Sequence, residues 1–144
     1  MAYYQGGGGK PDVMKRALDG LRRFAEGFDR NTYANYLLIG GTGLGKTHLS
    51  TAVAKTAIER GFDVLYVSAT AMLADFEKER FGNETAASSG NDTERYYSCD
   101  LLIIDDLGTE LINQFSTSCL YNLLNSRLVR KKSTIINTNF TQDE

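Results

Sequence analysis

The sequence predicts a three-layer α/β domain built on a parallel sheet. Short apolar runs alternate along the chain with segments in which apolar residues recur every three or four positions, which is the pattern of strands alternating with helices. The length of 144 residues is enough for one domain with a buried core. Of these residues, 42% are hydrophobic and 24% are charged, so the composition excludes disordered, collagen-like and coiled-coil chains.

The charge balance and the cysteines exclude further classes. A formal net charge of −2 excludes a strongly basic nucleic-acid-coating protein, although not a local basic patch. No apolar run approaches the roughly 18–20 residues of a membrane span, and the first ten residues lack the apolar stretch of a secretory signal. Cys99 and Cys119 have no metal-binding or redox spacing. We therefore expect reduced thiols in a cytoplasmic protein with no membrane partner.

The amino-terminal part is predicted to be a flexible lead, a helix and a connector. Residues 1–10 contain consecutive glycines, whose backbone freedom resists ordering. Within residues 11–35, the segment Asp12–Phe28 has the apolar spacing of an amphipathic helix. Charged residues that lie mostly off its apolar face are Arg16, Arg22, Arg23 and Glu26. Residues 36–144 then form the core domain.

Four short apolar runs in the core predict buried strands. These runs are Tyr36–Ile39, Val64–Ser68, Leu101–Ile104 and Thr134–Thr138. Because strands that alternate with helices pair in parallel through right-handed crossovers, their carboxyl ends should meet at one edge of the sheet.

Three helices are predicted between these strands. The first covers Lys46–Arg60 and stops at Gly61, and the second covers Ala71–Phe81 with a cap available at Ser68 or Thr70. Apolar spacing marks the third over residues 115–128. The polar segment Gly82–Ser98 is predicted to be a surface loop.

The turn after the first core strand carries a phosphate-binding signature. Residues Gly40–Thr47 match the pattern G-x-x-x-x-G-K-[ST] at every fixed position. Glycines let successive backbone N–H groups surround a phosphate, and the helix that begins near Lys46 adds its positive end. Lys46 is placed to reach the β- and γ-phosphates, and the Thr47 hydroxyl to hold Mg²⁺. The predicted nucleotide-binding residues are Gly41, Thr42, Gly43, Leu44, Gly45, Lys46, Thr47 and His48, the last without a role as a catalytic base.

Two acids follow the third core strand. Asp105 and Asp106 come directly after four apolar residues, so they should face the same crevice as the phosphate loop. Asp105 fits the magnesium-holding role, and Asp106 is placed to polarise an attacking water. Aspartate after a strand is also common in plain turns, and the phosphate loop favours the functional interpretation.

The fourth core strand supplies a candidate for sensing the nucleotide. In P-loop NTPases of the additional-strand class, one strand separates the phosphate-loop strand from the acidic strand and carries a polar sensor residue. Asn139, just past the strand end, is our first candidate for contacting the γ-phosphate or the water, and Asn137 is the alternative.

The base is predicted to be adenine. Asp105–Gly108 spells D-x-x-G, which GTPases use, but the guanine-reading [NT]-K-x-D should then follow the next strand. The chain has Asn139-Phe140-Thr141-Gln142 there, with no lysine in the required place.

Four blocks, taken in order, resemble the DnaC/DnaI-type helicase loaders, which are bacterial AAA+ ATPases. The blocks are residues 41–50, 105–110, 120–127 and 135–140, and the resemblance spans Tyr36 to Glu144. It implies an ATPase that acts with the replicative helicase, assembles into AAA+ oligomers and contacts single-stranded DNA. It also implies that Gly41–Thr47 form the nucleotide cradle, Thr47 and Asp105 the magnesium site, and Asn139 the first sensor.

The sequence departs from the family pattern in two ways. Asp106 stands where many AAA+ proteins have glutamate, and Glu110 is a nearby second carboxylate. The chain also stops at Glu144, before the arginine finger and the lid that the family carries, so we expect a core truncated before the lid, with slow hydrolysis.

Other interpretations stay open at this point. Transposase-helper ATPases share the fold and much of the pattern, a small-molecule P-loop kinase would need an arginine-rich lid, and a non-hydrolysing scaffold would differ in turnover. A basic cluster at the end of the third helix either supports the helix dipole or contacts single-stranded DNA. Its members are Arg127, Arg130, Lys131 and Lys132.

Overall fold

The computed structural model describes most of the core domain and parts of the segment before it. The described residues are 2–6, 19–20, 22–23, 26–27, 35–40, 46–81, 93–108 and 113–138. Within the predicted amino-terminal helix, Asp19, Gly20, Arg22, Arg23 and Glu26 are helical, and the last three are exposed as their spacing predicts.

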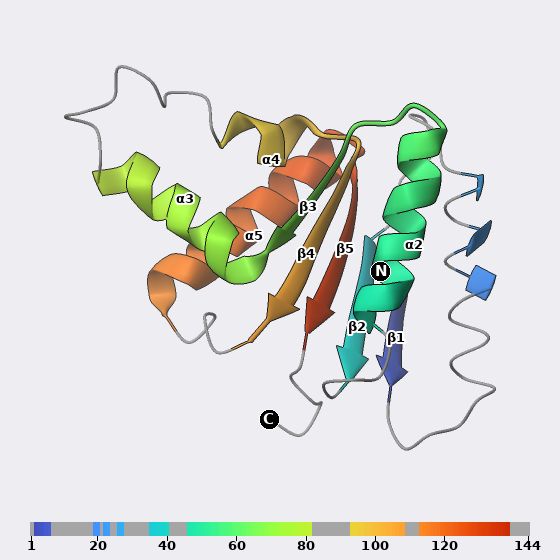
Figure 1. Ribbon diagram of the computed structural model, residues 1–144. Coiled ribbons are helices and arrows are strands. Elements are labelled where there is room, and N and C mark those ends of the chain that lie inside the picture. The colour runs from blue at the N-terminus through green and yellow to red at the C-terminus, as the bar shows by residue number, and fades with distance from the viewer. Residues whose placement is uncertain are drawn as a thin grey trace.

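The centre of the fold is a five-stranded sheet in the order β1-β2-β5-β4-β3, in which all neighbouring strands are parallel (Figure 1). The three-layer α/β prediction is therefore confirmed. The strands are β1 (Ala2–Gly6), β2 (Asn35–Gly40), β3 (Val64–Ser68), β4 (Leu101–Leu107) and β5 (Ser133–Thr138).

The prediction of a flexible lead is wrong for Ala2–Gly6, which forms the edge strand β1 beside β2. Tyrosine favours strands, and β1 contains Tyr3 and Tyr4. The glycines that follow these tyrosines favoured the prediction of a flexible segment. Pairing along β2 from Tyr36 to Gly40 outweighs the conformational entropy that ordering glycine costs.

The order of the central strands matches the additional-strand class. β5 lies between β2, which leads into the phosphate loop, and β4, which carries the acids. The strand over Thr134–Thr138, on which the sequence placed the sensor candidate, is therefore the intervening strand, whereas Val64–Ser68, which the sequence suggested for that position, forms the edge strand β3.

Helices cover both faces of the sheet. Helix α2 (Lys46–Glu59) lies on one face, and α3 (Ala69–Phe81), α4 (Glu94–Ser98) and α5 (Gln114–Val129) lie on the other (Figure 1). Their ends follow the predicted chemistry. Gly61 ends the α2 region with a φ of 88°, and the Ser68 hydroxyl accepts a hydrogen bond from Ala71 N at 3.1 Å.

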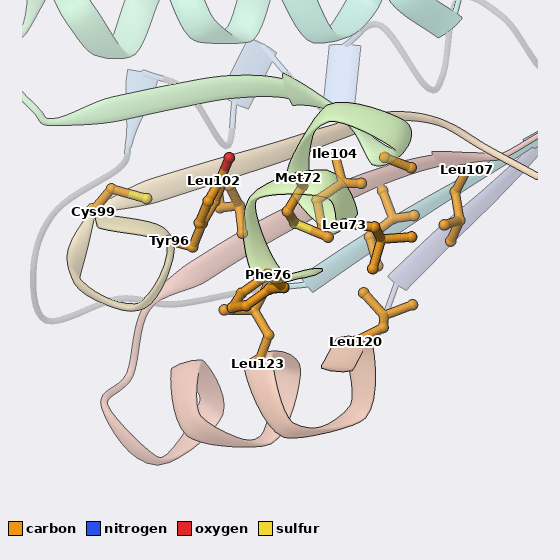
Figure 2. Packing of buried hydrophobic residues seen from close by; sticks show 12 residues of the cluster. Met72, Leu73, Phe76, Tyr96, Cys99, Leu102, Ile104, Leu107, Leu120 and Leu123 are labelled. Carbon is orange, nitrogen blue, oxygen red and sulfur yellow. The ribbon is translucent and has the colours of Figure 1, made fainter. Parts of the chain in front are cut away.

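Side chains alternate along β4 between the two layers. Leu102 and Ile104 join the core under α3, α4 and α5, where Phe76, Tyr96 and Leu123 converge (Figure 2). Since successive side chains of a strand point to opposite faces, Leu101, Ile103 and then Asp105 belong to the α2 face.

The prediction of a loop over Gly82–Ser98 is wrong at its end, where Glu94–Ser98 forms α4. Residues 82–92 lie outside the described residues. Tyr96 is buried against the Phe76 ring, with ring centroids 5.5 Å apart. Burial of this aromatic side chain stabilises a turn of helix whose polar composition resembles a loop.

Candidate functional site

The phosphate-binding signature joins the carboxyl end of β2 to the start of α2. β2 ends at Gly40, and α2 begins at Lys46, as the sequence predicts. Residues 41–45 and the side chains of Lys46 and Thr47 lie outside what the structure describes. His48 is exposed on the first turn of α2. The strand and helix needed around a phosphate loop are therefore both present.

The acidic strand β4 reaches the same edge of the sheet, where α2 begins (Figure 1). Its pairing with β5 shifts between Ile104 and Leu107, so Asp105 and Asp106 oppose the single residue Asn137. Asp106 has a φ of 58°, a left-handed conformation that is uncommon outside glycine. Such a bulge redirects side chains. Asp105 is partly buried here, whereas Asp106 is exposed.

Asp105 is held by side chains from the two strands that flank β4. Asn137 Nδ2 on β5 donates to Asp105 Oδ1 at 3.0 Å, and the Tyr66 hydroxyl on β3 donates to Asp105 Oδ2 at 2.9 Å. Both carboxylate oxygens thus have a donor, and the carboxylate plane is oriented by neighbouring strands.

The contact extends to α2 through Ser50. Its hydroxyl donates to Asn137 Oδ1 at 3.0 Å, and both side chains are buried. We call Ser50, Asn137, Asp105 and Tyr66 the strand-end network. Through it, the helix that follows the phosphate loop is connected to the acid on β4.

Sequence reasoning missed Ser50 and Tyr66, and it named Asn137 only as an alternative sensor. Two signals were available. Ser50 follows Lys46 by four residues, about one helical turn, and lies beside the apolar positions Leu49 and Val53. Asn137 follows Ile135 and Ile136 in a strand that is buried along its whole length, where an amide side chain needs a partner.

Asn139 and Glu110 fall outside the described residues. α5 is capped by Asn113, whose side chain accepts a hydrogen bond from Phe115 N at 2.7 Å.

The donor set at this edge fits Mg²⁺ bound together with a nucleotide. Among the described residues, no group of three or more His, Cys, Asp or Glu side chains is arranged to hold a metal ion. Mg²⁺ in nucleotide sites commonly takes one or two carboxylates together with phosphates and water. Asp105, partly buried and at the strand end, suits that limited protein contribution.

The predicted basic cluster is divided by the structure. Arg127 is completely buried, so it is not part of a surface for DNA. Arg130 pairs with Glu94 at 3.4 Å, and Lys132 pairs with Asp100 at 3.5 Å. Arg130 and Lys131 are exposed.

None of the helices within the described ranges is both long and apolar enough to cross a membrane.

The family model of the IstB-like ATP binding proteins matches residues 10–144. The chain belongs to this family. The match includes the phosphate loop, the acids and both candidate asparagines. This match, together with similarity to the helicase loader DnaC and to DnaI, confirms the resemblance inferred from the four sequence blocks.

Relatives of the IstB-like chain include proteins of DNA replication and of insertion sequences. The replicative helicase loader DnaC of Escherichia coli K12 is 26% identical over 132 residues, which is 89% of this chain and 51% of DnaC. An insertion sequence ATP-binding protein of Sinorhizobium fredii NGR234 is 35% identical over 98 residues, or 68% of this chain and 32% of that protein. The chain spans about half the length of the DnaC relatives it matches.

Solved structures confirm the AAA+ fold. The crystal structure of the DnaC helicase loader has a TM-score of 0.73 and 26% identity, covering 88% of this chain and 70% of that chain. The DnaI crystal structure has a TM-score of 0.69 at 22% identity, covering 90% of this chain and 64% of that chain.

Proposed function

We propose that this chain is a Mg-ATP-binding core of a AAA+ ATPase that acts on the replicative helicase during DNA replication. The observation that carries the proposal is the strand-end network, in which Asp105 on β4 connects through Asn137 to the helix that follows G-x-x-x-x-G-K-T. Family membership supports adenine nucleotide as the ligand.

The residues have distinct roles in this proposal. Backbone N–H groups of Gly41–Gly45 and the positive end of α2 hold the phosphates, and Lys46 neutralises charge on the β- and γ-phosphates. Thr47 and Asp105 hold Mg²⁺, which when bound offsets phosphate charge. Asp106, exposed at the bulge, polarises the attacking water, and Asn139 contacts the γ-phosphate.

A calorimetric titration tests nucleotide binding. Lys46→Ala should weaken Mg-ATP affinity by about tenfold or more, or about 1.4 kcal/mol, because it removes the cation facing the phosphates. Lys55→Ala on the exposed side of the same helix is the matched control and should bind like the wild type. Equal affinity of the wild type and Lys46→Ala would refute the phosphate-loop assignment, and tighter binding of GTP than of ATP would refute the adenine preference.

Hydrolysis by the isolated 144-residue chain is proposed to be slow. Transition-state charge in related NTPases is stabilised by an arginine finger, which contributes roughly 10³–10⁵ in rate. A steady-state phosphate-release assay should give turnover well below the roughly 1 s⁻¹ at the low end of typical enzymes. Turnover at or above that rate would show that the chain completes its own catalytic site.

The proposed partners are the replicative helicase, further copies of this protein and single-stranded DNA, all in the cytoplasm. DnaC relatives carry the name replicative helicase loader, which supports the helicase. Co-purification with the replicative helicase of the same organism should recover a complex. Contact of Arg130 and Lys131 with DNA would appear as a salt dependence that weakens by about 0.7 in log–log slope for each cation replaced by alanine.

A role as a transposase-helper ATPase is the second candidate. It is favoured by the insertion sequence ATP-binding relative, at 35% identity. The same co-purification, carried out with the transposase encoded beside the gene, discriminates between the two. A complex with the transposase and none with the helicase would select this second function.

A further inference from the structure

We propose that Asn137 and Tyr66 are positioning residues for the metal-holding carboxylate of Asp105, with Ser50 fixing the amide of Asn137. The inference rests on the proposed Mg-ATP site and adds side chains outside the phosphate loop and the acid pair. It makes magnesium affinity depend on four elements: α2, β3, β4 and β5.

The chemistry of the network leaves one direction for its hydrogen bonds. An ionised carboxylate only accepts, so the amide group that faces Asp105 must be Nδ2. Oδ1 of Asn137 then faces Ser50, which must donate, as its hydroxyl does at 3.0 Å. Ser50 thereby selects the amide orientation that presents a donor to Asp105.

Burial makes this orientation costly to change. Ser50 is 0% exposed and Asn137 is 1% exposed, so an amide turned the other way would place its oxygen against the carboxylate. Across the described residues, every buried side-chain nitrogen or oxygen has a hydrogen-bond partner. The network is satisfied as it stands.

Tyr66 holds the second carboxylate oxygen from the opposite side. Tyr66 aligns with Ile103 in the β3–β4 register, two residues before Asp105, so its side chain shares the α2 face. Its ring lines an apolar pocket with Ala54 and Ile58 of α2. The ring thus lies on the face of the sheet that α2 covers, and its hydroxyl reaches Asp105 from there.

The hydrogen bonds from Asn137 and Tyr66 orient the Asp105 carboxylate and still allow it to bind a metal ion. A carboxylate has about four acceptor positions, so hydrogen bonds from two side chains are compatible with metal binding. Partners that orient metal ligands typically affect metal affinity by about 10–100-fold. A merely structural network would instead affect stability alone.

The test measures magnesium enhancement, defined as the dissociation constant of ATP in EDTA divided by that in excess Mg²⁺. Asn137→Leu removes the amide at similar volume and should lower the enhancement by about tenfold or more. Tyr66→Phe removes one hydroxyl from a side chain that is 38% exposed, so the variant should fold. We expect it to lower the enhancement by about three- to tenfold.

Ser50 should act only through Asn137. Ser50→Ala should lower the enhancement less than Asn137→Leu, and the double variant should match Asn137→Leu alone because the two changes share one path. Thr134→Val is the control, since Thr134 is equally buried on β5 but accepts its hydrogen bond from Arg127. It should lower the melting temperature and keep the enhancement within about twofold of wild type.

The outcomes separate this inference from the proposed function. A wild-type enhancement near one would refute the Mg-ATP site itself. A strong wild-type enhancement that Asp105→Asn abolishes, but Tyr66→Phe leaves unchanged or increases, would overturn the positioning role, even if Asn137→Leu fails to fold.

Discussion

Two polar networks lie at opposite ends of β4 and β5, and they differ in the charged group at their centre and in its burial. At the amino-terminal ends, Arg127 donates to Thr134 Oγ1 and to the carbonyl oxygens of Tyr96, Cys99 and Ser133, at 2.6–3.0 Å. At the carboxyl-terminal ends, the strand-end network terminates on the partly buried carboxylate of Asp105 beside the exposed Asp106. The first network is enclosed and joins α4, α5 and β5, whereas the second ends on a carboxylate that is only partly buried.

The difference shows how a buried charge and a strand-end charge serve separate purposes. Burial lowers the pKa of Arg127, while interactions with Cys99 and Asp100 oppose that shift. Its forked donors suit several carbonyl groups at once, which a lysine could not satisfy. We infer that Arg127 maintains the fold and that Asp105 serves the nucleotide.

The largest expected effect breaks the Arg127 network. Arg127→Met should lower the free energy of unfolding by about 3 kcal/mol or more, because several buried carbonyl groups lose their donor. Urea denaturation measures this loss, and Arg127→Lys should recover only a part of it. A loss below about 1 kcal/mol would mean that water or neighbouring groups replace the guanidinium.

A smaller effect separates the two acids within the strand-end region. Asp106→Asn keeps the shape of the side chain but removes its charge, so single-turnover hydrolysis should slow by about 10²-fold. Mg-ATP affinity should change little, because Asp106 is exposed and outside the strand-end network. A loss of affinity as large as that of Lys46→Ala would instead assign Asp106 to metal binding or to the fold.

The smallest effect concerns the pH dependence of the enclosed end. Burial raises the pKa of the Cys99 thiol, with Arg127 opposing the shift. As pH rises above the ordinary thiol pKa of about 8.5, Cys99 loses its proton in the unfolded state before it does so in the folded state. Deprotonation therefore favours the unfolded state, and the free energy of unfolding falls. Unfolding free energies measured from pH 7 to 10 should fall less steeply in Cys99→Ala than in wild type. Identical slopes would contradict a role for this thiol.

Local patterns predicted most of the strands and helices but not all of them. Preferences of neighbouring residues determine the strands β3 and β4 and the end of α2 at Gly61. These elements could therefore be predicted from the sequence. α4 depends on Tyr96 meeting Phe76, and β1 on pairing with β2. Both are contacts between distant residues, which periodicity does not reveal.

The candidate site was predictable in its parts rather than in its connections. Motif spacing named Lys46, Thr47, Asp105 and Asp106, because phosphate and metal chemistry restrict those residue types. Tyr66 on β3 reaches Asp105, and Ser50 on α2 reaches it through Asn137 on β5, because the strand order places β3 and β5 on either side of β4. The local patterns of a single sequence do not specify that strand order.

The magnesium enhancement of wild type and Asp105→Asn, measured alongside Arg127→Lys, tests the central distinction most directly. We predict that Asp105→Asn lowers the enhancement by about tenfold or more with little change in unfolding free energy. Arg127→Lys should lower stability and leave the enhancement at the wild-type value. An unchanged enhancement in Asp105→Asn, or an equal loss in Arg127→Lys, would contradict the division between a nucleotide-binding end and a fold-maintaining end.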